Sequence, residues 1–277
     1  MQPTHRTAFV LGGGGVLGAV EVGMLRALLE TGVRPDLVLG TSVGALNGAM
    51  LAMDPRPEVV DRLIGLWRSA GESELYADNA VRQVRRAIRT GTHLYSSRPL
   101  RERLESELGD TVFEDLEVPF QCCAASIERA REHWFSTGRV VDAVLASAAV
   151  PGLFGPQRIG DEHFLDGGIV NSIPVGRAVD QGASVVFVLQ VGRVDRPLSV
   201  PRRPWDVARV SFEIARRHRF HREMNEVPTD VEVHVLPTGG GSAKDDTLLL
   251  AHRDFSRVEQ RMDAAYDASR AYLETLG

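Results

Sequence analysis

The sequence is poor in cysteine, lysine and aromatic residues. Its 277 residues include two cysteines, and Phe, Trp and Tyr together make up 6 % of the chain. Cys122 and Cys123 are adjacent within an apolar run, and neighbouring cysteines seldom pair with each other, so we expect two buried thiols. Lys244 is the sole lysine. The two adjacent cysteines argue against a disulfide framework or a cysteine-rich metal site, and we expect neither a metal nor an organic cofactor.

Positive charge is also in short supply. The chain has 32 Lys and Arg residues against 37 Asp and Glu residues, which gives a formal net charge of −5. A nucleic-acid partner requires a positive field that attracts phosphates, and this balance does not provide one. We therefore expect no nucleic-acid partner.

Long hydrophobic runs are missing as well. The apolar stretches at 140–150 and 183–189 are far shorter than the roughly 20 residues that a membrane-spanning helix needs. Residues 1–11 lack the apolar core and cleavage site of a secretory signal, so we expect a cytoplasmic protein. A hydrophobic content of 43 % with 25 % charged residues is typical of an ordinary globular protein.

Apolar patterns alternate between strand and helix along the chain, which predicts an α/β fold. We expect three α/β/α layers around a mainly parallel central sheet, formed by one domain over residues 1–277. A helical insert is expected at about 58–108, a sheet that ends near Val191, and a C-terminal elaboration at about 204–277. The expected strands are 8–11, 37–39, 120–127, 133–136, 184–191 and 231–236, and the expected helices are 18–30, 43–53, 140–149, 205–226 and 255–276.

The most specific local motif is Gly-Thr-Ser-Val-Gly at residues 40–44, between a predicted strand and a predicted helix. This is the context of a nucleophile elbow, in which a serine sits on a strained turn. Gly40 and Gly44 leave room around the turn, and the following helix points its N-terminal amides toward Ser42. Ser42 is therefore either a nucleophile or a simple helix N-cap, and its flanking elements favour the nucleophile.

A glycine-rich loop at 12–18 follows the first predicted strand. The spacing of its glycines also fits a dinucleotide site, but such a site needs an acidic residue after the second strand, and Asp36 precedes that strand. The alternative is an oxyanion hole, because adjacent parallel strands place this loop beside the Ser42 turn. The backbone amides of Gly13, Gly14 and Gly15 are then the expected donors.

A serine nucleophile needs a base, and the eight histidines offer no clear one. His234 and His252 come late enough in the chain for the Ser, acid, His order of an α/β-hydrolase, but neither lies in a loop marked for catalysis. Asp166 follows a strand-like segment and precedes Gly167 and Gly168. Its residue type and neighbours suit either a base or a tight turn.

Taken in order, these motifs resemble those of the patatin-like phospholipases, serine lipid acyl hydrolases that use a Ser-Asp dyad without histidine. The resemblance covers about residues 8–191 and implies a patatin-like fold. The matching blocks are the oxyanion loop at 12–18, the elbow at 40–44, the helix end at 146–151, and the dyad motif of Asp166, Gly167 and Gly168 with Asn171 and Pro174. One departure is Leu17, which stands where the family usually has a basic residue.

The resemblance implies that Ser42 is the nucleophile, that Asp166 is the base and that the amides of Gly13 to Gly15 form the oxyanion hole. We expect a phospholipase A-like serine esterase whose partner is a lipid or ester substrate. Apolar neighbours such as Phe164 and Leu165 are expected to raise the pKa of Asp166. The alternatives are a Ser-His-Asp hydrolase or acyltransferase using His234 or His252, and a catalytically silent lipid-binding protein.

Two arginine-rich segments have the pattern of amphipathic helices. Each either packs its apolar side on the core or docks on an anionic membrane surface, which would make the protein peripheral at the inner membrane face. The first combines Arg82, Arg85, Arg86 and Arg89 with Val81, Val84 and Ile88. The second places Arg209, Arg216, Arg217, Arg219 and Arg222 opposite Val207, Val210 and Ile214. The sequence leaves the oligomeric state open.

Overall fold

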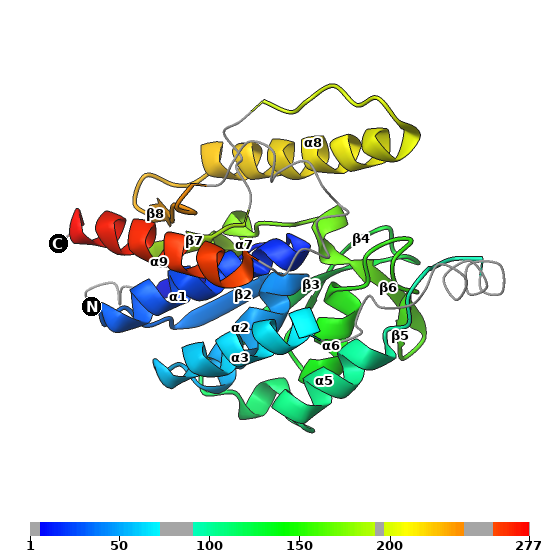
Figure 1. Cartoon of the computed structure of the whole chain (residues 1–277), viewed down its shortest axis with the longest axis horizontal. Coiled ribbons are helices and arrows are strands. Elements are labelled where there is room, and N and C mark those ends of the chain that lie inside the picture. The colour runs from blue at the N-terminus through cyan, green and yellow to red at the C-terminus, as the bar shows by residue number, and fades with distance from the viewer. Residues whose placement is uncertain (1–5, 73–90, 192–196, 241–256, 277) are drawn as a thin grey trace.

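The computed structural model describes residues 6–72, 91–191, 197–240 and 257–276. Within these residues eight strands form one sheet in the order β5-β6-β3-β2-β1-β7-β8, with β4 paired to β3 (Figure 1). The strands are β1 Thr7–Leu11, β2 Leu37–Thr41, β3 Phe120–Ser126, β4 Arg131–Phe135, β5 Gln157–Ile159, β6 Glu162–Asp166, β7 Val185–Leu189 and β8 Glu232–Val235.

The centre of the sheet is parallel. Strands β3, β2, β1, β7 and β8 run in one direction, whereas β4, β5 and β6 pair antiparallel at one side. The predicted mainly parallel sheet is therefore confirmed. The predicted end of the sheet near Val191 is wrong, because β8 pairs in parallel with β7, with His234 opposite Phe187.

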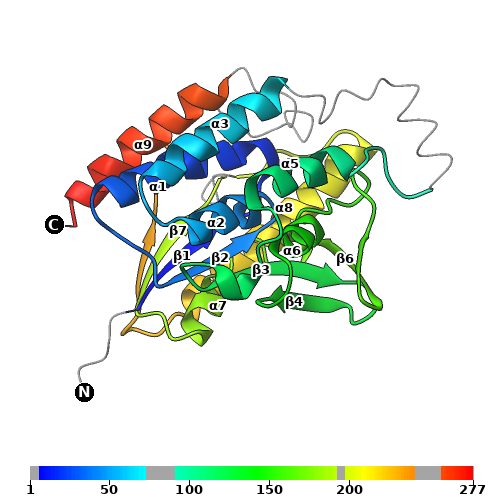
Figure 2. The ribbon, with the colours of Figure 1, turned by 90° about the horizontal axis from the view of Figure 1, so that it is seen from below.

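Helices cover both faces of the sheet and make three layers, as Figure 2 shows. One face carries α1 Ala19–Glu30, α2 Val43–Met53, α3 Glu58–Glu72, α5 Arg98–Leu108, α6 Val140–Ser147 and α9 Val258–Glu274. The other face carries α7 Val175–Asp180 and α8 Pro204–Asn225. The α/β/α layering predicted from the alternating pattern is confirmed.

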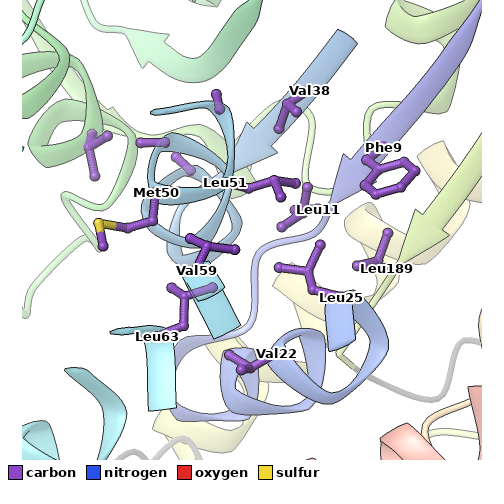
Figure 3. Close-up of a cluster of buried hydrophobic side chains, with 14 of the residues drawn as sticks. Phe9, Leu11, Val22, Leu25, Val38, Met50, Leu51, Val59, Leu63 and Leu189 are labelled. Carbon is purple, nitrogen blue, oxygen red and sulfur yellow. The ribbon is translucent and has the colours of Figure 1, made fainter. Parts of the chain in front are cut away.

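Alternation along β1 explains how one strand serves two cores. Phe9 and Leu11 point to the cluster under α1 and α2, and Ala8 and Val10 point to the cluster under α7 and α8. Figure 3 shows the larger cluster, in which Phe9 and Leu11 gather with side chains from the covering helices and from β7. These four residues of β1 are fully buried, so this strand is the centre of the fold.

The predicted helical insert is described in two parts, α3 and α5. Residues 73–90, with the first arginine-rich segment, lie outside the described residues, as does His252. The second arginine-rich segment is α8, and the prediction that its apolar side packs on the core is confirmed only at Val210. Val207 and Ile214 are exposed, whereas Val210, Phe220 and Arg216 are buried. Arg216 packs inward because it pairs with Glu213 on the same helix.

Candidate active site

Ser42 lies between the end of β2 and the start of α2, in a strained conformation. Its φ of 56° and ψ of −121° place a non-glycine residue at positive φ, which costs on the order of 1–3 kcal/mol. Contacts on both sides hold the turn. The Ser42 N–H donates to Ser147 Oγ at 2.9 Å, and Thr41 Oγ1 donates to the Asn171 carbonyl at 2.8 Å.

The two glycines of the elbow are required by close backbone approach. A Cβ atom on Gly40 would clash with the Gly44 carbonyl and the Ala45 backbone. A Cβ atom on Gly44 would clash with the Leu11 carbonyl at the end of β1. Glycine at both positions therefore lets β1, β2 and α2 meet directly beneath Ser42.

Asp166 ends β6 and faces Ser42 across β3. Its Oδ2 accepts a hydrogen bond from Ser42 Oγ at 2.6 Å, and its Oδ1 accepts one from the Gly168 N–H at 2.7 Å. Ser42 and Asp166 are 6 % and 4 % exposed. Gly167 allows this approach, because a Cβ atom there would clash with the Cys123 carbonyl.

Burial raises the pKa of Asp166 to about 6, although the hydrogen bonds from Ser42 and Gly168 oppose the rise. The carboxyl is then a better proton acceptor than a solvated aspartate, yet it is ionised at neutral pH. The neighbouring Cys123 is buried, and burial raises the pKa of its thiol well above the ordinary value, so it remains neutral. Asp166 can therefore accept the proton of the Ser42 hydroxyl.

The glycine-rich loop lies against the Ser42 turn, since a Cβ atom on Gly13 would lie 3.4 Å from the Cβ of Ser42. The Gly13 N–H is already engaged, because it donates to the Ser172 carbonyl at 2.9 Å. Within the described part of the chain, the N–H groups of Gly14 and Gly15 have no hydrogen-bond acceptor. Of the three expected donors, these two are therefore available to a developing oxyanion.

Ser42 opens into an apolar pocket with about 740 Å³ of empty space, part of it open to solvent. Arg103 carries the sole charged side chain among the described lining residues. The α3 and α5 helices, from the predicted insert, form part of the wall. The lining residues are Gly15, Val16, Ser42, Val43, Leu46, Leu66, Trp67, Leu100, Arg103, Val144, Ala148, Val150 and Phe154. Such a pocket suits a hydrocarbon chain placed next to the serine.

His234, considered from its position in the chain as an alternative base, lies elsewhere. Its strand β8 is separated from β2 by β1 and β7, which places it about 14 Å away at the usual strand spacing. Its ring stacks on Phe187 at 4.9 Å, and its Nδ1 lies 3.1 Å from the Tyr272 hydroxyl. The structure therefore does not bring His234 to Ser42.

Ser147 lies in the matching block at 146–151, but the sequence predicts no role for it in the site. It is fully buried, accepts from the Ser42 N–H and donates to the Cys123 carbonyl at 2.6 Å. A hydroxyl inside an otherwise apolar helix end was the available signal. Among the described residues there is no cluster of His, Cys, Asp and Glu suited to a metal ion, and no helix has the length and apolar character needed to span a bilayer.

Comparisons of the chain with known proteins point to one family. A family model described as patatin-like phospholipase matches residues 9–179. The lysophospholipases nte1 of Aspergillus terreus and Emericella nidulans are each 32 % identical over 194 residues, which cover 67 % of this chain and 12 % of those proteins. The chain thus spans about an eighth of the length of these relatives. The crystal structure of VipD from Legionella pneumophila is similar in fold, with a TM-score of 0.51 and 16 % identity over 99 % of this chain and 67 % of that one.

Proposed function

Because the chain belongs to the patatin-like phospholipase family, we propose that it hydrolyses the carboxylic esters of lipids, with Ser42 as nucleophile and Asp166 as base. The observation that carries the proposal is the 2.6 Å hydrogen bond from Ser42 Oγ to Asp166 Oδ2 at the base of an apolar pocket. An aspartate that is buried and hydrogen-bonded to a strained serine is arranged for nucleophilic catalysis.

The proposed reaction has two steps. Ser42 Oγ attacks the ester carbonyl as its proton passes to Asp166, and the alkoxide leaving group takes that proton when the carbon–oxygen bond breaks. A water molecule then attacks the acyl-enzyme, gives its proton to Asp166, and releases the fatty acid while Ser42 recovers the proton. In both steps the amides of Gly14 and Gly15, with the N-terminus of α2, stabilise the negative oxygen.

The pocket indicates the substrate class. Its apolar walls accommodate an acyl chain, and the relatives named above are lysophospholipases, so we infer that single-chain phospholipids are among the substrates. Leu17 stands where the family usually places a basic residue, so the oxyanion loop adds no side-chain cation for a phosphate group.

We further propose that the protein works at a membrane surface on the cytoplasmic side, and that α8 makes the contact. Figure 1 shows α8 on the outside of the molecule. Val207 and Ile214 on α8 are 50 % and 56 % exposed; just before the helix, Val200 is 86 % exposed and Arg202 is exposed as well. Phe212, on the same helix, lies against Gly168 beside the dyad. Apolar and basic side chains together favour an anionic lipid surface.

Vesicle co-sedimentation tests the membrane contact. We expect binding to phosphatidylglycerol vesicles that weakens in 0.5 M salt and is lost in a Val207→Ser, Ile214→Ser double variant. Equal binding to neutral and anionic vesicles would contradict the charge contribution, and unchanged binding of the double variant would contradict the assignment to α8.

Ester hydrolysis tests the catalytic proposal. The substrates are p-nitrophenyl esters of increasing chain length, and the proteins are the wild type, Ser42→Ala, Asp166→Asn, His234→Ala and His252→Ala. We expect the first two substitutions to abolish turnover and both histidine variants to retain it. Loss in a histidine variant would favour a Ser-His-Asp enzyme, and an inert wild type would favour a lipid-binding protein without catalysis.

A further inference from the structure

The loop that follows Asp166 touches every part of the candidate site. Its Gly168 N–H donates to Asp166 Oδ1. Its Asn171 carbonyl accepts from Thr41, the residue before Ser42, and its Ser172 carbonyl accepts from the Gly13 N–H of the oxyanion loop. The base, the nucleophile turn and the oxyanion loop therefore all depend on the position of residues 167–172.

An arginine on α8 anchors the other side of this loop. Arg219 Nη1 donates to the Val170 carbonyl at 2.7 Å, Nη2 donates to Glu132 Oε2 on β4 at 2.9 Å, and Nε donates to Glu223 Oε1 at 2.7 Å. One planar guanidinium thus joins the loop, the sheet and its own helix. Its fork of fixed donors suits three acceptors that lie in different directions.

The carboxylates of Glu132 and Glu223, which pair with Arg219, also contact the loop and the residues after it. Asn171 Nδ2 lies within hydrogen-bond distance of Glu132 Oε2 at 3.3 Å and of Glu223 Oε1 at 3.4 Å, and Glu223 Oε2 accepts from the Gly176 N–H at 2.8 Å. Asn171 and Glu223 are 2 % and 7 % exposed. Burial lowers the pKa of Arg219, but the hydrogen bond to Glu223 and the charge of Glu132 outweigh it, and the net shift is upward. Arg219 therefore stays charged and compensates two carboxylates.

We propose that Arg219 is a positioning residue for the reaction, because it holds the 167–172 loop and through it the geometry between Ser42 and Asp166. The inference rests on the proposed function for its kinetic consequences. It also assigns α8, which lies beyond the residues 9–179 matched by the family model, to the working active site. A displacement of about 1 Å in such a site can reduce turnover by about 100-fold.

The test compares Arg219→Gln and Arg219→Lys with the wild type. Arg222→Gln is the matched control, because Arg222 is exposed on the same helix one turn away. Rates on a short p-nitrophenyl ester are expressed per active site, counted by fluorophosphonate labelling of the serine. We expect kcat to fall by about 10- to 100-fold in Arg219→Gln and less in Arg219→Lys, with KM changed by less than about threefold. Arg222→Gln should match the wild type.

The pH profile separates positioning from stability. Burial is the main cause of the raised pKa of Asp166, so a loosened loop that admits water should move the acid limb of kcat/KM in Arg219→Gln to lower pH. If the rate per labelled site and the acid limb both equal those of the wild type, Arg219 only stabilises the fold and the inference is wrong.

Hydrogen exchange tests the same inference without turnover. Peptides that cover residues 164–172 should exchange faster in Arg219→Gln and Arg219→Lys than in the wild type or Arg222→Gln, while peptides from α1 should not change. Equal exchange in all four proteins would overturn the inference. An inert wild type with faster exchange in the Arg219 variants would instead contradict the proposed function and leave the anchoring role supported.

Discussion

Ser42 and Asp166 are 124 residues apart in the sequence, yet the serine Oγ lies 2.6 Å from the carboxylate Oδ2, and both side chains are buried. The strained backbone conformation of Ser42 is the one in which its hydroxyl reaches the Asp166 carboxylate. The strain is maintained by contacts on four sides of the turn, from β1, α6, β6 and the loop after β6.

The first prediction concerns pH. Asp166 accepts a proton only when it is ionised, and its pKa is raised to about 6 by burial. We expect kcat/KM on a short ester to rise tenfold per pH unit below about pH 6 and to level off above it. The facing hydroxyl of Ser42 and neutral thiol of Cys123 add no titration in this range. A profile that is flat from pH 5 upward would contradict the raised pKa.

The second prediction is that replacing the buried Asp166 carboxylate stabilises the protein. A carboxyl whose pKa is higher in the folded state than in the unfolded state costs stability that grows as the pH rises from the unfolded to the folded value and is complete above the folded value. Asp166→Asn should therefore raise the free energy of unfolding by about 1–3 kcal/mol at pH 8, and this gain should shrink between pH 6 and pH 4. Urea unfolding at several pH values measures it. A gain that is independent of pH would show that ionisation is not its cause.

The third prediction concerns Ser147. Ser147→Ala leaves the Ser42 N–H and the Cys123 carbonyl without their buried partner, which should lower the free energy of unfolding by about 1–3 kcal/mol. Because the same hydroxyl fixes the Ser42 backbone, kcat should also fall by about tenfold or more. Ser211→Ala, at an exposed position of α8, is the control and should change neither quantity. Unchanged kcat in Ser147→Ala would show that the hydrogen bond from the Ser42 N–H to Ser147 does not contribute to catalysis.

The fourth prediction contrasts two glycines. In Gly44→Ala the new methyl group meets backbone oxygens of the oxyanion loop and β1, so the free energy of unfolding should fall by about 3 kcal/mol or more. In Gly65→Ala on α3 nothing lies within 4 Å of the new Cβ atom. Because alanine is a better helix former than glycine, this variant should raise the free energy of unfolding by up to about 1 kcal/mol. Thermal unfolding of both variants checks the contrast. Equal effects would mean that close approach does not explain the glycine at 44.

The fifth prediction concerns His234. His234→Gln removes the stacking on Phe187, so it should lower the free energy of unfolding by about 1 kcal/mol. Its kcat/KM on esters should stay within about threefold of the wild-type value, because β1 and β7 lie between its strand and Ser42. A large kinetic loss in a folded variant would restore the histidine-based alternative.

The sequence predicts those parts of the site in which local geometry restricts the residue type. Gly40 and Gly44 mark the elbow because backbone atoms leave no space for a side chain, and this requirement is visible as spacing. Ser147 carries no such mark, since its hydroxyl meets the Ser42 N–H across 105 residues and only the folded chain brings them together.

The same reasoning explains the errors in the fold. The four residues of β8 are too few to reveal whether they pair with the sheet, and β7 provides the edge that they complete. On α8 the apolar period suggests that Ile214 faces the core, but ion pairs decide the orientation and Arg216 is buried instead. Hydrophobic pattern describes a helix poorly where paired charges form its inner face.

The central position of β1 has a consequence for synthesis on the ribosome. One side of β1 finds its partner β2 within about 30 residues, but the other side waits for β7 at Val185–Leu189, and Gly23 on α1 is covered by Met262 of α9. Strand β1 and helix α1 are therefore completed only by elements that follow them much later in the chain. Until residues 185–189 are synthesised, the nascent chain carries an unpaired edge of the mostly apolar strand β1, which exposes it to aggregation.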